Sequence, residues 1–236
     1  MAYGVKLKIW GDYACFTRPE MKVERVTYDI ITPSAARGIL EAIYWKPEIR
    51  WVVTRLHVLN PIRFTHVRRN ELDCKIPAGR VKQAQTGKTT NLGIAIEDHR
   101  QQRAAMVLKE VCYGIEAHLQ VLRHDGPEDN PEAKHLDQFR RRAEKGEYFH
   151  HPYLGCREFP AHFELVETFP PCDESLGGER DLGFMLHDIL FVPNGKGEII
   201  ESNKGRRLTA HPRFSRFIMR DGTIEVPPLA AEGGAS

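Results

Sequence analysis

A long alternation near the middle of the chain constrains the fold more than any other sequence feature. Between residues 107 and 122, apolar side chains occupy every second position, and mostly polar or small side chains lie between them. The apolar set consists of Val111, Tyr113, Ile115, Ala117, Leu119 and Val121. A period of two predicts a β-strand with one face in the core and a second face that is solvated or covers a ligand.

Two predicted helices begin with the same kind of signal. Thr32 and Asn130 are residue types that cap helix N-termini, and each is followed by a proline, which suits the first helical turn. The first helix is ended by Pro47, and the second is expected to end at Gly146. Their apolar stripes consist of Ala36, Ile39, Leu40 and Ile43, and of Leu136, Phe139 and Ala143.

Strand patterns flank both helices. Residues 4–10 alternate, residues 49–59 indicate a mostly buried strand, and residues 152–166 have an extended pattern. A phase slip near Thr54 suggests a β-bulge in the second of these strands. The order is β-α-β, a long segment, then β-α-β. It predicts an α+β, ferredoxin-like fold, and the open sheet face of this fold often binds RNA.

The C-terminal part of the chain has a different character. A strand is expected over residues 183–192, and residues 217–226 predict a β-hairpin because Asp221-Gly222 suits a type I′ turn. We therefore expect two domains. Residues 1–166 form the ferredoxin-like domain, and residues 167–236 form a small antiparallel β domain with a flexible tail.

Basic residues are concentrated in two segments. Residues 61–105 lack a sustained period, so we expect a long inserted loop; its nine basic and four acidic residues give a net charge of +5. Residues 134–145 add +3, and since the whole chain has only +2, the remainder is −6. Such clustering is typical of a nucleic-acid-binding surface, although a solvated loop and a charged helix face would look the same. The candidate RNA-binding residues are Arg68, Arg69, Arg140, Arg141 and Arg142.

Missing features exclude several classes of protein. No apolar run approaches the roughly 20 residues of a membrane helix, and residues 1–10 lack a signal-peptide core, so we expect neither a membrane partner nor export. The five cysteines are scattered, which favours a reducing cytoplasm over a disulfide framework. Glycine-rich phosphate loops, zinc-protease motifs and converging His, Cys or carboxylate sets are not visible, so we expect no metal and no cofactor.

Lys134 and His135 are the strongest candidates for chemistry. They lie near the predicted N-terminus of the second helix, where the helix dipole favours phosphate. A histidine exchanges protons near neutral pH and an adjacent ammonium can stabilise a phosphorane, which suffices for metal-independent RNA cleavage. A Lys-His step is also common on polar helix faces, and spacing alone favours that interpretation. Tyr44 is either a packing residue with a wet hydroxyl or a hydroxyl donor to phosphate or ribose.

These residues lie in stretches that resemble the CRISPR-associated Cas-five family of subtype I-C, a branch of the RAMP superfamily of RNA-binding proteins. The stretches are Gly11-Asp12-Tyr13-Ala14, Ile43-Tyr44-Trp45-Lys46-Pro47, Leu108-Lys109-Glu110-Val111, Lys134-His135 and Tyr153-Leu154-Gly155-Cys156-Arg157-Glu158-Phe159. They follow in the family's order across most of residues 3–165, and the last of them is expected in the final strand of the core. The insert and the C-terminal part match less clearly.

The resemblance implies both a fold and a function. Family members combine a ferredoxin-like, RRM-related domain with a small β-rich C-terminal domain. In subtype I-C they cleave precursor CRISPR RNA without metal at the 3′ base of each repeat hairpin, leaving 2′,3′-cyclic phosphate and 5′-hydroxyl ends. The resemblance assigns this reaction to three residues. His135 would transfer protons, Lys134 would stabilise phosphate charge, and Tyr44 would position or activate the 2′-hydroxyl.

The resemblance also implies partners. After cleavage the protein would keep the 5′ handle of the CRISPR RNA and join the backbone and large subunits of the Cascade interference complex. Many relatives in other subtypes are non-catalytic, so a structural subunit that only caps the 5′ handle is the alternative. The same basic surface would also permit contacts with double-stranded DNA through phosphates alone.

Overall fold

The computed structural model describes residues 4–21, 23–89, 92–123, 130–193, 199–201 and 207–229. The end of the predicted flexible tail, from residue 230, lies outside these ranges. The elements in chain order are β1 (Gly4–Ala14), α1 (Pro33–Ile43), β2 (Ile49–Val58), β3 (Phe64–Leu72), α2 (Ala78–Gln85), α3 (Ile96–His99), β4 (Arg100–Val121), α4 (Pro131–Glu144), β5 (His162–Leu165), a short 3₁₀ helix (Glu174–Leu176), β6 (Glu179–Pro193), β7 (Ile199–Glu201), β8 (Arg207–Arg220) and β9 (Thr223–Glu225). None of the described helices combines the length and apolar character that a membrane crossing needs.

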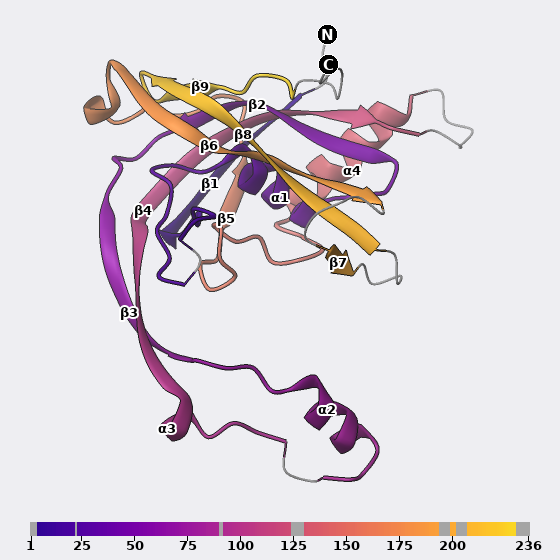
Figure 1. Ribbon diagram of the computed structural model, residues 1–236. Helices are drawn as coiled ribbons and strands as arrows, with labels where there is room; N and C mark the ends of the chain where they lie inside the picture. The colour runs from indigo at the N-terminus through magenta and orange to yellow at the C-terminus, as the bar shows by residue number, and fades with distance from the viewer. Residues whose placement is uncertain are drawn as a thin grey trace, which may run out of the picture.

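The predicted ferredoxin-like arrangement is confirmed. Strands β5, β1, β4 and β2 lie in that order, and every neighbouring pair is antiparallel. Helices α1 and α4 contact each other and cover one face of this sheet (Figure 1). The buried side of the β4 alternation, which includes Tyr113 and Ile115, packs into the core with Leu40 of α1 and Phe139 of α4. The fold is therefore α+β, as the sequence predicts.

The predicted helix caps and the predicted β-bulge are present in the structure. The Thr32 hydroxyl accepts a hydrogen bond from the Ala35 N–H at 3.2 Å, and the Asn130 side chain accepts one from the Ala133 N–H at 3.1 Å. Both helices are thus capped by their own preceding residue. The predicted bulge is also present, because the register between β2 and β4 shifts between Val53 and Arg55.

Residues 61–105 do not form the loop that we expected. Strand β3 pairs antiparallel with the first part of β4, from Phe64 opposite Leu108 to Leu72 opposite Arg100. We call residues 64–108 the arm; it leaves the body of the protein and carries α2 and α3 at its far end (Figure 1). No residue of β3 is buried. The strand therefore lacks the apolar period that sequence analysis detects.

Residues 152–166 are mostly not a strand, which corrects a second expectation. Only His162–Leu165 pairs with β1, and the preceding residues form a turn closed by a bridge between Tyr153 and Pro160. Gly155 has φ +83°, and a Cβ there would lie 2.1 Å from the Cys15 carbonyl oxygen. The turn is thus pressed against the end of β1, and only glycine fits at that contact.

The C-terminal strands continue the same sheet. Asp221 and Gly222 both have positive φ, as a type I′ turn requires, and they join β8 to β9. Strand β9 pairs with β2, which gives the order β2-β9-β8-β6. Strand β6 also contacts α1. The division into domains at residues 166 and 167 stays a prediction.

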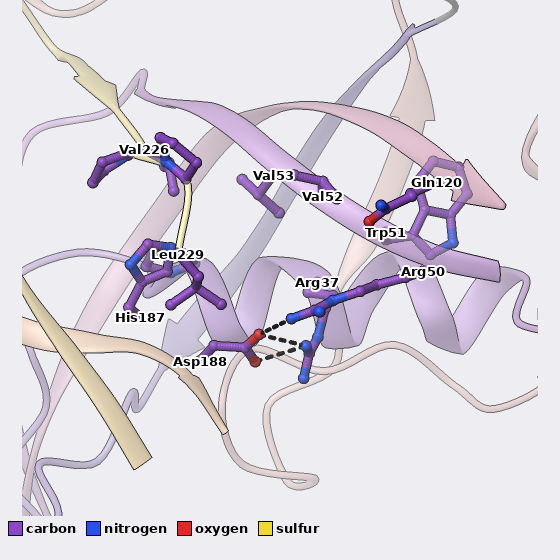
Figure 2. A pocket seen from close by; sticks show the side chains of 13 residues that line it. Arg37, Arg50, Trp51, Val52, Val53, Gln120, His187, Asp188, Val226 and Leu229 are labelled. Carbon is purple, nitrogen blue, oxygen red and sulfur yellow. Dashed lines mark hydrogen bonds and ion pairs between the residues drawn. The ribbon is translucent and has the colours of Figure 1, made fainter. Parts of the chain in front are cut away.

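A buried carboxylate fastens β6 to the ferredoxin-like part. The Asp188 side chain is only 7% exposed and accepts hydrogen bonds from Arg37 of α1 at 2.7 Å and from Arg50 of β2 at 3.0 Å (Figure 2). Two guanidinium groups thus share one carboxylate from a strand more than 130 residues away in sequence. Removing that carboxylate leaves the two guanidinium groups without their negatively charged partner, which destabilises the fold.

We predict that Asp188→Ala lowers the free energy of unfolding by about 2–3 kcal/mol, because it breaks a largely buried ion pair. Urea denaturation followed by circular dichroism measures the change. Asp181→Ala is the matched control, since Asp181 lies on the same strand as Asp188 and forms an exposed ion pair with Arg216 of β8. The control should be close to wild type. Equal stability of the two variants would contradict the fastening role of Asp188.

Candidate catalytic site

The end of α1 fixes Tyr44 in place. Helix α1 ends at Ile43, four residues before Pro47, and Tyr44 follows it with extended backbone angles (φ −151°, ψ 121°). The Tyr44 N–H donates to the Leu40 carbonyl at 3.0 Å, and the Trp51 indole N–H donates to the Tyr44 carbonyl at 2.9 Å. Both backbone polar groups of Tyr44 are therefore bonded, which directs its side chain toward α4.

The structure brings Tyr44 and His135 into contact. The Tyr44 hydroxyl oxygen lies 2.8 Å from Nδ1 of His135, and the two residues are 91 positions apart in sequence. Tyr44 is 3% exposed and His135 is half-buried, while the neighbouring Lys134 is exposed. Helix α4 begins at Pro131, so the Lys-His step lies near the N-terminal end of the helix, as predicted.

Burial keeps the Tyr44 hydroxyl protonated. Loss of solvent raises the pKa of Tyr44 above its ordinary value; the Arg142 guanidinium, 5.3 Å from the ring centre, opposes this, and Glu48 adds to it. A neutral hydroxyl is both a donor and an acceptor. It can accept from a protonated Nδ1, which leaves Nε2 with a lone pair, or donate to a bare Nδ1, which leaves Nε2–H. Tyr44 can therefore support His135 either as a base or as an acid.

The three arginines of α4 have different positions. Arg142 lies beside the Tyr44 ring and donates to the Ile43 carbonyl at 3.1 Å, so it binds the C-terminal end of α1. Arg140 donates to the Gly4 carbonyl at 3.3 Å, near the start of β1. Arg141 is exposed. Arg142 thus belongs to the support of Tyr44, whereas Arg140 and Arg141 are both exposed.

Arg68 and Arg69 lie elsewhere, on the arm. Arg69 forms an ion pair with Glu158 in the Tyr153–Pro160 turn, and its guanidinium lies 5.6 Å from the Phe159 ring centre. Arg68 is exposed on the other side of the same strand. The arm leaves the body on the side away from α4 (Figure 1). The two basic segments therefore do not surround the Tyr44–His135 pair together.

Two exposed aromatic residues lie near the C-terminal end of α1, and sequence reasoning did not single them out. Trp45 is 51% exposed and Phe149 is 73% exposed. The Phe149 and His150 N–H groups donate to the Ala42 carbonyl at 2.8 and 3.1 Å, which holds their loop against the last turn of α1. We call Trp45 and Phe149 the aromatic platform. The aromatic and histidine run directly after the Gly146 helix stop was the available signal.

Comparison with known proteins places the chain among CRISPR-associated proteins. The family described as CRISPR-associated protein (Cas_Cas5) matches residues 4–227. A protein from Mannheimia succiniciproducens named CRISPR pre-crRNA endoribonuclease Cas5d is 51% identical, and the match covers 98% of each chain. A protein of the same name from Thermus thermophilus is 44% identical over 94% of this chain and 91% of the relative.

A solved structure supports the fold independently. The crystal structure of a functionally uncharacterized protein from Streptococcus mutans matches with a TM-score of 0.63. The match covers 96% of this chain and 93% of the other, at 22% sequence identity. It supports the arrangement of helices and strands.

Proposed function

The chain belongs to the CRISPR-associated Cas5 family, and from this membership we propose that it is an endoribonuclease that cleaves precursor CRISPR RNA within its repeats. The names of its relatives at 51% and 44% identity support this activity. The observation that carries the assignment of a site is the 2.8 Å contact between the Tyr44 hydroxyl and Nδ1 of His135, beside the exposed Lys134.

The reaction that suits this site is attack by a ribose 2′-hydroxyl on the adjacent phosphorus. His135 removes the hydroxyl proton through Nε2, the 2′-oxygen forms a new P–O bond, and the bond to the 5′-oxygen breaks. The leaving 5′-oxygen takes a proton from the His135 imidazolium, which gives a 5′-hydroxyl end and a 2′,3′-cyclic phosphate and restores the neutral imidazole. Lys134 stabilises the extra negative charge on the phosphorane. Side chains of this protein thus carry out the whole reaction, and no metal is required.

Tyr44 serves in this proposal as a positioning residue. Its ring is almost fully buried and its hydroxyl is bonded to His135, so it acts through the imidazole rather than on the 2′-hydroxyl. The family resemblance implies that Tyr44 positions or activates the 2′-hydroxyl; in this proposal it positions His135 instead. The hydroxyl fixes the orientation of the ring and accepts a charge-assisted hydrogen bond when His135 carries a proton.

The product is proposed to stay bound. We infer that the protein keeps the 5′ handle and joins the backbone and large subunits of Cascade, and the projecting basic arm supports such contacts. A subunit that only caps the handle would use the same surface without turnover. We also propose that basic side chains of the arm contact the phosphates of double-stranded DNA.

All five cysteines are free thiols, which supports a location in the reducing cytoplasm.

We predict that purified protein cleaves repeat RNA in EDTA and that His135→Ala reduces the single-turnover rate at least about 100-fold, because it removes the proton-transfer group. Lys134→Ala should reduce the rate by a factor of about 10–100. His162→Ala and Lys145→Ala, which change exposed residues outside the site, are the matched controls. A 2′-deoxy nucleotide upstream of the cut should block cleavage. Intact RNA with wild-type protein would favour the capping subunit instead.

Tyr44→Phe tests the positioning role. The ring and its packing stay, while the hydroxyl bonded to His135 is lost. We expect a rate reduction of about 10-fold and a shift of the acidic limb of the pH–rate profile to lower pH, because the imidazolium loses an acceptor. Thermal unfolding checks that the fold is unchanged. A profile that keeps its wild-type position would show that Tyr44 contributes packing alone.

The aromatic platform predicts a separate effect on affinity. Trp45→Ala or Phe149→Ala should weaken binding of repeat RNA by about 1–3 kcal/mol if a base stacks on the lost ring. The cleavage rate at saturating protein should stay within about twofold of wild type. Phe184→Ala, which removes a ring of similar exposure on β6, is the control. Filter binding measures the affinity; unchanged affinity in both platform variants would exclude stacking there.

A further inference from the structure

The far end of the arm has almost no apolar core. No residue of α2 or α3 is buried, and none of β3 is buried either. Folded segments of this size that cannot bury apolar surface are usually held by disulfides, a metal ion or a partner. Cys74 is a free thiol, and no disulfide is present among the described residues.

Three metal-ligating side chains converge where the arm's two strands end. Asp73 and Cys74 directly follow β3, and His99 directly precedes β4. The last ladder pair joins Leu72 to Arg100, and the Asp73 N–H then donates to the His99 carbonyl at 3.1 Å. Strand pairing therefore brings together donors that lie 25 residues apart in sequence, which is why motif spacing did not reveal them.

The distances between the donor atoms suit a single cation. Nδ1 of His99 lies 2.9 Å from the Asp73 carboxylate and 3.3 Å from the Cys74 sulfur, and the three donor atoms all lie within 4.8 Å of one another. A tetrahedral zinc ion with Zn–S near 2.3 Å and Zn–N near 2.0 Å separates its sulfur and nitrogen ligands by roughly 3.5 Å. The arrangement needs only small adjustments to surround an ion.

The chemistry of the donors selects the metal. Thiolate, imidazole and carboxylate together favour zinc, whereas Mg²⁺ and Ca²⁺ prefer oxygen ligands alone. Among the residues that the structure describes, no other three such side chains bring their donor atoms within 4.8 Å of one another.

We propose that Asp73, Cys74 and His99 bind one Zn²⁺ ion that fastens the ends of β3 and β4 and orders the segment between them. Water or a partner group completes the coordination. The site is structural, because it lies at the far end of the arm, away from α1 and α4, which carry Tyr44 and His135 (Figure 1). It does not rest on the proposed RNA cleavage.

Zinc binding to the full chain tests the site. Protein stripped with EDTA and kept reduced should bind one equivalent of Zn²⁺ by calorimetry, and Co²⁺ at the same site should give a thiolate charge-transfer absorption. Cys74→Ser and His99→Ala should each weaken the affinity at least 10-fold. The double variant Cys172→Ser/His150→Ala, which removes one Cys and one His elsewhere, should bind like wild type. Binding that both site variants retain, or no binding by wild-type protein, would overturn the site.

Hydrogen exchange tests the fastening role. Zn²⁺ should slow amide exchange within residues 75–89 and 92–98 of the wild-type protein at least 10-fold, and it should leave Cys74→Ser unchanged. Exchange in α1 and α4 serves as the internal reference. Stoichiometric Zn²⁺ binding that does not slow amide exchange in residues 75–89 and 92–98 would contradict the proposal, since the ion would then not order this segment.

Discussion

The buried indole of Trp51 is the contact on which the candidate site depends. Its N–H donates to the Tyr44 carbonyl at 2.9 Å, and its ring lies 4.7 Å from that of Phe139 in α4. One side chain of β2 thus fixes the end of α1 and the position of α4 together, at 1% exposure. A displacement of either helix by about 1 Å would break the hydrogen bond between Tyr44 and His135.

The Tyr44–His135 pair and the basic arm lie in different parts of the protein. The Tyr44–His135 pair is held between two helices on one face of the sheet, where packing restricts motion. The arm extends from the other side of the body and carries eight basic and four acidic residues. The proposed cleavage and the contacts that the arm makes can therefore change independently of each other.

Sequence reasoning succeeded where the signal is local. The Thr32 and Asn130 caps, the alternation in β4 and the Asp221-Gly222 turn each depend on neighbouring residues alone. It failed for the arm, because β3 is polar on both faces and is defined only by its pairing with β4. The contact between Tyr44 and His135 depends on tertiary packing across 91 residues, so the family resemblance selected those residues and their spacing did not.

The central claim is that Tyr44 acts through His135, and a double-mutant cycle on the cleavage rate tests it most directly. Single-turnover rates of Tyr44→Phe, His135→Ala and the double variant would be compared at saturating protein. If Tyr44 only positions the imidazole, the double variant cleaves no more slowly than His135→Ala alone, since the hydroxyl has nothing left to support. Losses that multiply would show that Tyr44 contributes to the reaction independently and would contradict this account.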